Sequence, residues 1–382
     1  MISIGLMSGT SLDGVDAVLV RIRPRGRTYA VDVLNFVTLP FEEPLLRRLH
    51  AALPPNAGSV ADVAELHHDL GEAFAKAAEL ASADTPIDYV ASHGQTMWHD
   101  GDRHVTLQLG DPFVIRELLE TTVCYDFRSG DCAAGGHGAP LVPYVDTLLL
   151  SSDDEDRVAV NVGGIANLTV LPKESDPYGV VAFDSGPGNM LIDAFVRERT
   201  SGEMTFDRDG ALAAKGTADA AALQAMLADR YFALAPPKST GRERFGSQFL
   251  KAHADRLSRL SLEDGAATLT ALTVQSLADA IASNAPEGAR VLVSGGGAHN
   301  NTLMAQLQER LPRSRVERSE AMNLHGDAKE AIAFALLGYE TLRGRAANVP
   351  RATGAKRPVP LGSIAPYDLH SLLAKVEMEC RQ

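Results

Sequence analysis

A glycine-containing turn near the N-terminus is the first segment whose residue types and spacing suit chemistry. The turn Gly9-Thr10-Ser11-Leu12-Asp13-Gly14 separates two apolar segments, and its glycines permit positive φ and a close approach of the backbone. Successive amides and two hydroxyls can therefore point at one anion, such as a phosphate. No lysine follows the glycines, so this is not a Walker A loop. The alternative is a polar hairpin loop with no ligand.

A second glycine turn, Asn161-Val162-Gly163-Gly164-Ile165-Ala166-Asn167, stands at the corresponding place in the second half of the chain. A double glycine between two strands is by itself typical of a plain turn. Its place in a repeated order of elements favours a second phosphate contact. Two such loops facing each other across a cleft would hold the phosphates from both sides.

An acidic residue, Asp184, stands in Phe183-Asp184-Ser185-Gly186-Pro187-Gly188-Asn189, where a predicted strand ends and a Gly/Pro turn leads into a helix. A carboxylate at the C-terminal end of a strand projects into the crevice where α/β proteins place their ligands. Asp184 is therefore the candidate general base. The structural alternative makes it a cap of the helix that begins near Pro187.

The segment from Val291 to Asn300 combines an apolar strand with Gly295-Gly296-Gly297 and a following helix. The missing side chains leave room for a flat purine against the backbone. A dinucleotide site is only weakly indicated, because the spacing departs from G-x-G-x-x-G at Asn300.

Three further groups of polar residues are candidates for sugar contacts. The segment Ser92-His93-Gly94-Gln95-Thr96 follows a predicted strand, although His93 alone fits a packed structural residue equally well. Arg128 can bind a carboxylate through a two-pronged contact. Glu330 lies in a predicted helix whose small residues also suit close helix packing.

The elements that position these residues repeat in order. Strands are predicted at 2–8, 15–23 and 31–39, helices at 43–53 and 60–81, strands at 89–92 and 105–109, a helix at 112–120 and a strand at 121–127. Strands at 157–162, 165–171, 180–183 and 290–294 and helices at 301–311 and 328–343 follow, interrupted by a helical region at 187–284.

This order predicts an α/β fold of two ribonuclease-H-like (actin-like ATPase) lobes with an interlobe active-site cleft. The first lobe is expected at 1–155 and the second at 156–382, with the C-terminal tail free to pack back on the first lobe.

The composition limits which kinds of partner and which cellular compartment suit this chain. The 382 residues are 45% hydrophobic and 22% charged, which is the composition of a folded globular protein. A net charge of −13 disfavours nucleic acid, and no apolar stretch reaches the ~20 residues that a bilayer helix needs. Cys124, Cys132 and Cys380 lack metal-ligand spacing and form no disulfide framework, so a reducing cytoplasm is expected.

Taken together, the motifs resemble those of the anhydro-N-acetylmuramic acid kinase family, in the sugar kinase, chaperone ATPase and actin superfamily. The resemblance spans nearly the whole chain, and the six segments occur in the family's order. They are GLMSGTSLDGVD at 5–16, SHGQTMWH at 92–99, DFR with AAGGHGAPLVP at 126–143, NVGGIANLT at 161–169, FDSGPGN at 183–189 and SGGGAHN at 294–300.

The resemblance implies roles for these residues. Asp184 would be the catalytic carboxylate. The expected ATP contacts are Gly9, Thr10, Ser11, Leu12, Asp13, Gly14, Val15, Asp16, Asn161, Gly163, Gly164, Asn167, Gly295, Gly296 and Gly297. The expected substrate contacts are His93, Gln95, Thr96, Arg128, Ser185, Gly186 and Glu330.

The implied activity is ATP-dependent opening of the 1,6-anhydro ring of anhydro-N-acetylmuramic acid, with water added at C1 and phosphate placed on O6, in recycling of cell-wall fragments. The cofactors would be ATP and Mg²⁺, and the assembly a homodimer. An aspartate that the wider superfamily places before the first phosphate loop aligns with Met7, so the metal ligands are unknown, and Asp184, Asp13 and Asp16 are the carboxylates to consider.

Three other functions stay open at this point. A kinase for an ordinary amino sugar or hexose would share every nucleotide motif. An actin-like or chaperone-like ATPase switch would show polymer or client binding without sugar-dependent ADP release. A Rossmann dehydrogenase is disfavoured, because the segment that begins at Gly295 departs from the G-x-G-x-x-G spacing.

Overall fold

The computed structural model describes residues 1–9, 11–53, 58–174, 176–319 and 328–380. The chain divides into two compact units, here called unit 1 (Met1–Leu149 with Asp327–Gln382) and unit 2 (Leu150–Gly326). The second predicted lobe ran from 156 to 382, whereas the last part of the chain groups with unit 1. Helix α13 explains this assignment, because it packs on the sheet of unit 1.

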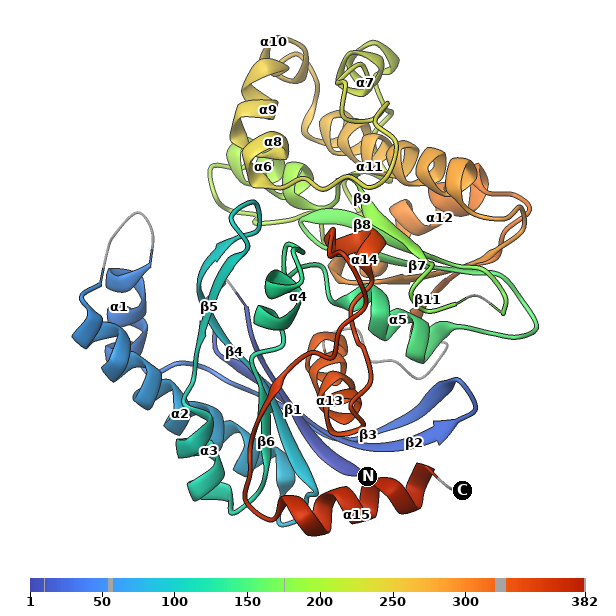
Figure 1. Cartoon of the computed structure of the whole chain (residues 1–382). Coiled ribbons are helices and arrows are strands. Elements are labelled where there is room, and N and C mark those ends of the chain that lie inside the picture. Colours follow the sequence, from blue (N-terminus) through green and yellow to red (C-terminus); the bar gives the residue numbers. More distant parts are fainter. Residues whose placement is uncertain (10, 54–57, 175, 320–327, 381–382) are drawn as a thin grey trace. The chain divides into compact units, whose positions relative to one another are not determined.

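Unit 1 is built on one sheet with helices on both faces (Figure 1). Its strands are β1 (Ile2–Ser8), β2 (Val15–Arg25), β3 (Thr28–Leu39), β4 (Tyr89–Asp100), β5 (Val105–Leu109), β6 (Val123–Tyr125) and β12 (Ser363–Ala365). Its helices are α1 (Glu43–Ala52), α2 (Val60–Ser82), α3 (Pro112–Leu119), α4 (Ser129–Ala133), α5 (Val142–Leu150), α13 (Lys329–Leu342), α14 (Pro350–Thr353) and α15 (Leu369–Cys380).

Unit 2 is built on a smaller sheet. Its strands are β7 (Arg157–Val162), β8 (Ile165–Leu171), β9 (Val181–Pro187), β10 (Arg290–Ser294) and β11 (Val316–Arg318). Its helices are α6 (Met190–Arg199), α7 (Ala220–Leu227), α8 (Arg242–Phe245), α9 (Ser247–Ala252), α10 (Ala254–Leu257), α11 (Leu262–Asn284) and α12 (Asn301–Arg310), with 3₁₀ turns η1 (Arg208–Gly210) and η2 (Gly296–His299).

The two sheets have the same topology. The order β6-β4-β1-β2-β3 in unit 1 corresponds to β11-β10-β7-β8-β9 in unit 2. In each sheet the first three strands in the chain form an antiparallel set. A fourth strand then pairs in parallel with the first strand, and a fifth strand pairs in parallel with the fourth. This arrangement confirms the prediction of two ribonuclease-H-like units. Strands β5 and β12 extend the sheet of unit 1 by pairing with β4 and β6.

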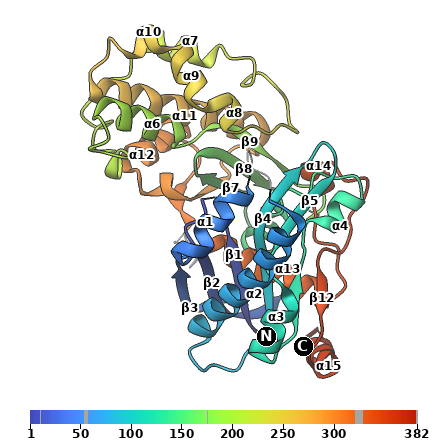
Figure 2. The same cartoon turned by 90° about the vertical axis from the view of Figure 1, so that its left-hand side faces the viewer.

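The core of unit 1 forms on both faces of its central strand. Ile4 and Leu6 of β1 are fully buried in one cluster with Leu66, Leu70 and Phe74 of α2. The intervening residue faces the other way, since a Cβ on Gly5 would lie 1.9 Å from the Ala331 carbonyl oxygen of α13. Side chains alternate along a strand, so α2 and α13 cover opposite faces. The turned view in Figure 2 has α2 on the near side of this sheet.

The core of unit 2 lies under two helices. Val158, Val160 and Val162 of β7 pack with α11 and α12 in one buried cluster. A second cluster joins α6, α9 and α11 away from the sheet and gives the helical region its own core. The predicted helical region at 187–284 is therefore confirmed in outline, as several separate helices.

Two strands continue further than the sequence predicted, and both changes bear on the site. Strand β4 runs to Asp100, so Ser92 to Thr96 lie inside the strand rather than after it. Strand β9 runs through Asp184 to Pro187, so the acidic residue lies within the strand, and neither ends it nor caps a helix. In both cases pairing with a neighbouring strand extends the element through Gly and polar residues of low strand propensity.

Throughout the described ranges, the longest helices are too polar to serve as membrane spans.

Candidate active site

A row of polar side chains crosses the sheet of unit 2. Asn161 of β7 lies opposite Asn167 of β8, and Asn167 lies opposite Asp184 of β9. Ser294 of β10 pairs with Asn161 on its other side. Directly opposed residues have their side chains on the same face, so four strands present one polar line. The register thus brings together residues that the sequence offered as separate candidates.

Strand β9 carries a bulge directly after Asp184. Asn167 pairs with Asp184 and Ala166 pairs with Gly186, which leaves Ser185 as the extra residue. Bulges re-aim side chains and are common next to active sites. The buried Ser185 hydroxyl donates to the Ala166 carbonyl, so it points away from the polar row. Gly186 has φ 153°, and a Cβ there would lie 2.7 Å from the Phe232 ring.

The Asp184 carboxylate is half-buried and held by backbone groups. Its Oδ2 accepts a hydrogen bond from the Thr240 amide at 2.9 Å, and its own amide donates to the Lys238 carbonyl at 3.2 Å. Burial raises the pKa of Asp184 to about 6, with Glu243 adding to the rise and the Thr240 amide opposing it. A carboxylate with such a pKa is ionised at neutral pH and can still accept a proton, as a general base must.

The glycines after β10 leave space that side chains would close. Gly295 has φ +79°, and a Cβ on it would lie 2.6 Å from Asn161 Oδ1. A Cβ on Gly297 would lie 2.3 Å from Val162 Cγ1. Gly296 is more open, with Asn189 Nδ2 at 3.4 Å. Asn300 ends the motif as the cap of α12, accepting from the Leu303 amide. The turn therefore lies against the start of the glycine hairpin of β7.

The hairpin Gly163-Gly164 is tied to the start of α6. The Gly163 carbonyl accepts from the Asn189 amide at 2.8 Å, and the Gly164 carbonyl accepts from the Gly188 amide at 2.9 Å. A Cβ on Gly188 would lie 2.3 Å from the Gly163 oxygen, so the two segments meet backbone to backbone. Asn189, which sequence reasoning did not single out, also donates to the Val162 carbonyl and joins the three glycine motifs of unit 2.

In unit 1 the turn after β1 is closed by its neighbours. The Ser8 hydroxyl donates to the Gly14 carbonyl at 2.7 Å, and a Cβ on Gly14 would lie 2.3 Å from the Leu39 carbonyl oxygen. Within the turn, Ser11 donates to Asp13, while Leu12 is buried at φ 60°. Thr10 lies outside the described residues.

Gln95 and Thr96 lie on β4 beside this turn. The fully buried Gln95 amide donates to the Gly9 carbonyl at 3.2 Å and so fixes the start of the turn. The Thr96 hydroxyl accepts from Gln108 at 3.3 Å on the neighbouring strand. The two residues were predicted as substrate contacts, and their hydrogen bonds here are to protein groups.

His93 and Arg128 form a directed pair. The Nδ1–H of buried His93 donates to the Gly94 carbonyl at 2.7 Å, which leaves Nε2 as an acceptor. Arg128 Nε donates to that Nε2 at 3.0 Å, and its Nη1 donates to the Gly138 carbonyl at 2.8 Å. Burial, followed by the charge of Arg128, holds the pKa of His93 well below its usual range. The ring therefore stays neutral in this tautomer, and among the described residues Arg128 Nη2 has no hydrogen-bond partner.

Glu330 acts on Arg128 electrostatically, and Asp16 acts on Glu330. Burial raises the pKa of Glu330, and Arg128 opposes that rise while Asp16 adds to it. Burial also lowers the pKa of Arg128, with Glu330 acting against the change. Asp16 is the second residue of β2, and its carboxylate accepts from the Thr38 hydroxyl at 2.5 Å. The structure thus groups His93, Arg128, Glu330 and Asp16 in unit 1.

Comparison with known proteins identifies the family. The family model for Anhydro-N-acetylmuramic acid kinase matches residues 1–367. The chain is 42% identical to the Anhydro-N-acetylmuramic acid kinase of Caldanaerobacter subterraneus subsp. tengcongensis, over 95% of this chain and 96% of that one. It is 45% identical to the protein of the same name from Xanthomonas axonopodis pv. citri, over 95% and 97% of the two chains.

The chain belongs to the anhydro-N-acetylmuramic acid kinase family.

Membership in the anhydro-N-acetylmuramic acid kinase family confirms the predicted resemblance and makes the chain an ATP-using kinase. The dehydrogenase and the non-catalytic switch are thereby set aside. Among solved structures, a ROK family glucokinase from Streptomyces griseus, crystallised with glucose and AMPPNP, covers 88% of this chain and 99% of its own. It shares 12% identity at a TM-score of 0.40, too low to establish a common fold.

The carboxylates of the described residues suit a Mg²⁺ ion that the nucleotide holds, rather than one that the protein holds alone. Within the residues that the structure describes, no three His, Cys, Asp or Glu side chains gather as a metal site. Mg²⁺ in kinases is usually held by one or two carboxylates together with phosphates and water, rather than by an all-protein cage. Asp13 and Asp16 in unit 1 and Asp184 in unit 2 could each serve as such a carboxylate.

Proposed function

We propose that the chain uses ATP to open 1,6-anhydro-N-acetylmuramic acid hydrolytically and to phosphorylate O6. The products are N-acetylmuramic acid 6-phosphate and ADP, and the pathway is cell-wall (murein) recycling. The observation that carries this proposal is the half-buried Asp184 carboxylate, which has a pKa of about 6 and stands at the end of a polar row. Family membership supports the choice of substrate.

The bridged sugar determines what the base must do. O6 joins C6 to C1 and carries no proton, so a base acting on a sugar hydroxyl has nothing to remove. Asp184 instead takes a proton from water as the water oxygen bonds to C1. The C1–O6 bond breaks, O6 bonds to the γ-phosphorus of ATP, and the bond from that phosphorus to the leaving oxygen of ADP breaks. General-base help of this kind typically contributes ~10²–10⁴-fold to the rate.

Phosphoryl transfer needs alignment and neutralised charge more than covalent help from the protein. We assign the phosphates to the backbone of Gly9–Asp16 and Asn161–Asn167, and the adenosine to Gly295–Gly297. Close contacts exclude a side chain at Gly14, Gly295 and Gly297, as with Val162 at Gly297. Mg²⁺, carried on the phosphates and contacted by Asp13 or Asp16, would supply charge neutralisation.

Arg128 is the proposed partner of the substrate's lactyl carboxylate. Nε and Nη1 are engaged by His93 and Gly138, which orients the guanidinium and leaves Nη2 to donate. His93 is then a positioning residue rather than a direct sugar contact, because its ring is 3% exposed and both nitrogens have protein partners. Glu330, close enough to influence Arg128, is assigned to a sugar hydroxyl.

The proposal extends to assembly and location. A homodimer is the assembly that the family resemblance implies, and light scattering on the purified chain tests it against a monomer. A cytoplasmic location agrees with Cys124 and Cys132, which are buried free thiols.

The decisive assay offers the purified protein ATP, Mg²⁺ and the anhydro sugar, and identifies the product by mass. Gain of one water and one phosphate is expected. The open sugar, N-acetylmuramic acid, is the matched competitor and tests the remaining alternative of an ordinary amino-sugar kinase. If the open sugar were phosphorylated and the anhydro sugar were not, the hydrolytic mechanism would be wrong.

A further inference from the structure

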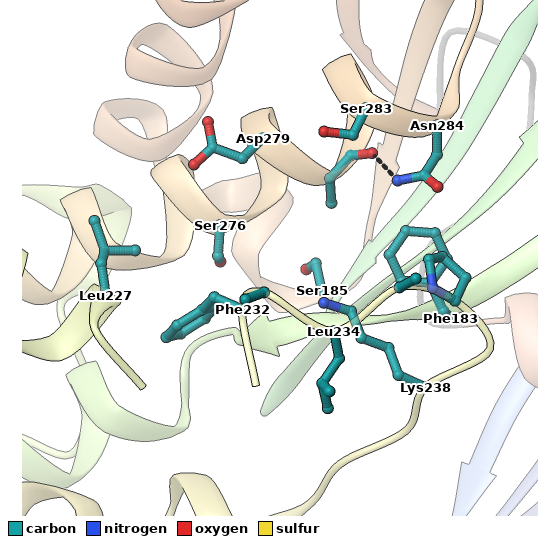
Figure 3. Close-up of a pocket in the computed structure, with 14 residues that line it drawn as sticks. Phe183, Ser185, Leu227, Phe232, Leu234, Lys238, Ser276, Asp279, Ser283 and Asn284 are labelled. Atoms are coloured by element: carbon teal, nitrogen blue, oxygen red, sulfur yellow. Dashed lines mark hydrogen bonds between the residues drawn. The ribbon is translucent and has the colours of Figure 1, made fainter. Parts of the chain in front are cut away.

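A cavity of about 460 Å³ lies within unit 2, between β9 and α11 (Figure 3). Phe183 and Ser185 of β9 line it, whereas Asp184 between them does not. Phe183 packs in the buried cluster on the α11 face of the sheet, whereas Asp184 lies opposite Asn167 on the other face. The cavity is therefore separate from the polar row that carries the proposed base.

The walls of the cavity differ in polarity. Figure 3 shows Ser276, Asp279, Ser283 and Asn284 projecting from α11 along one side. Phe183, Leu227, Phe232 and Leu234 provide the apolar surface, and Leu234 is 50% exposed. Small-molecule sites commonly have this size and combine an apolar lining with a few polar groups.

Lys238 supplies a positive charge at the cavity. Its Nζ lies 4.7 Å from the centroid of the Tyr231 ring and 5.7 Å from that of Phe183, and it donates to the Tyr231 carbonyl at 3.2 Å. No carboxylate within the described part of the chain forms an ion pair with it. Burial lowers the pKa of this ammonium. An anion that enters the cavity would stabilise this half-buried ammonium through a charge-assisted hydrogen bond.

Asp279, the one acidic side chain among the lining residues, repels an anion less strongly than Lys238 attracts it. Asp279 lies on the exposed side of α11, where Gln275 donates to its Oδ1 at 2.6 Å. Solvent screens an exposed charge more than a half-buried one. Three other polar lining groups are occupied as donors, since Ser185, Ser276 and Asn284 donate to the Ala166, Thr273 and Ala280 carbonyls.

We propose that this cavity binds a small amphipathic anion, with an aromatic or branched apolar body against Phe183 and Phe232 and a carboxylate paired with Lys238. The ligand class follows from the unpaired ammonium, the apolar wall and the separation from the proposed base. Nothing in this site requires the nucleotide or the sugar.

The test titrates the full-length protein with 4-phenylbutyrate, followed by saturation-transfer NMR and calorimetry. Its neutral counterpart, 4-phenylbutan-1-ol, is titrated in parallel. The expected result is millimolar binding of the carboxylate, at least tenfold tighter than that of the alcohol. No detectable binding, or equal binding of the two compounds, would overturn the proposal.

Two variants locate the site. Lys238→Met should weaken 4-phenylbutyrate at least tenfold and leave the alcohol unchanged, with thermal unfolding used to verify that the variant is folded. Asp279→Asn should tighten the carboxylate about twofold, because it removes an opposing charge. Weaker binding in that variant would instead indicate a zwitterionic or cationic occupant and contradict the proposed class.

Asp184→Asn is the control that separates this inference from the proposed function. It should bind 4-phenylbutyrate like the unmodified protein, because residue 184 does not line the cavity. Lost turnover with retained binding would support both proposals. Retained turnover would remove Asp184 from the mechanism without affecting this site, whereas lost binding would show that the cavity and the base are one site.

Discussion

The two units share a sheet topology but hold their functional side chains by different means. In unit 1 Arg128 is oriented by another side chain, His93, and the turn after β1 is fixed by the Gln95 amide. In unit 2 Asp184 is held by the Thr240 backbone amide and by its place opposite Asn167. Unit 1 thus depends on the identity of several buried polar residues. Unit 2 depends more on backbone geometry, and should accept an isosteric change at Asp184 without losing its structure.

Asp184→Asn is expected to have the largest effect and tests the unit 2 side of the contrast. The amide keeps an oxygen to accept the Thr240 N–H but cannot take a proton from water, so kcat should fall ~10²–10⁴-fold. Nucleotide affinity should remain. Steady-state kinetics and nucleotide titration measure both.

The matched control is Asp193→Asn on α6. Burial raises the pKa of Asp193 to about 6, as it does for Asp184, but Asp193 has no place in the polar row. Turnover should be unchanged in this variant. An equal loss in both variants would attribute the effect to a general change in unit 2.

Arg128→Lys is expected to have the next largest effect and tests the side-chain network of unit 1. In arginine, the planar guanidinium bonds to His93 and Gly138 and still presents Nη2 to the sugar. A lysine ammonium cannot reproduce this planar arrangement of donors. KM for the sugar should rise roughly 10- to 100-fold, because hydrogen bonds to charged groups contribute ~1.5–3 kcal/mol. KM for ATP should change less than twofold. Equal increases would argue against a role in sugar binding, and exposed Arg103→Lys serves as the control.

Gly297→Ala should have a smaller effect, through backbone space alone. Its new Cβ would lie 2.3 Å from Val162 Cγ1, and such overpacking typically costs ~1–3 kcal/mol of stability. We expect a lower melting temperature and a several-fold higher KM for ATP. Gly296→Ala, where the nearest atom is 3.4 Å away, is the control for packing and should leave the melting temperature unchanged. Similar behaviour of the two alanine variants would show that this turn is not close-packed.

The smallest expected effect is the dependence of stability on pH. Folding raises the pKa of Asp184 from 3.8 to about 6, so its ionisation in the folded state costs stability as pH rises through that interval. Below pH 3.8 the cost is absent. Asp184→Asn should therefore be more stable than the unmodified chain by about 1–2 kcal/mol at pH 8, after allowance for partial exposure, and equally stable at pH 3.5. Urea unfolding at both values measures it, and a less stable variant at pH 8 would reverse the assigned direction.

Local sequence patterns were sufficient for most elements but not for the pairing that extends them. Strands at 2–8, 157–162, 165–171 and 290–294 agree with the structure, because their apolar runs end at clear turns. The extension of β4 through His93 and of β9 through Asp184 depends on pairing with the adjacent strands β5 and β8, which the local apolar pattern does not show. From the sequence, His93 and Asp184 are therefore assigned to recognisable motifs. Their placement where strands end was wrong, because both residues lie inside strands.

The candidate residues were identifiable, whereas their partners were not. No sequence pattern indicates that Thr240 donates to Asp184, since 56 positions separate them and an irregular segment carries Thr240. The bond from Arg128 to His93 likewise joins residues 35 positions apart. The motif that contains Asn189 was a signal for its role, because the residue ends the same FDSGPGN segment as Asp184.

The most direct test of the mechanism runs the reaction in ¹⁸O-labelled water and analyses the promptly quenched product by mass spectrometry. If Asp184 directs water to C1, one ¹⁸O enters each sugar molecule at the C1 hydroxyl, and the transferred phosphate contains none. A label in the phosphate, or an unlabelled phosphorylated sugar, would contradict the account.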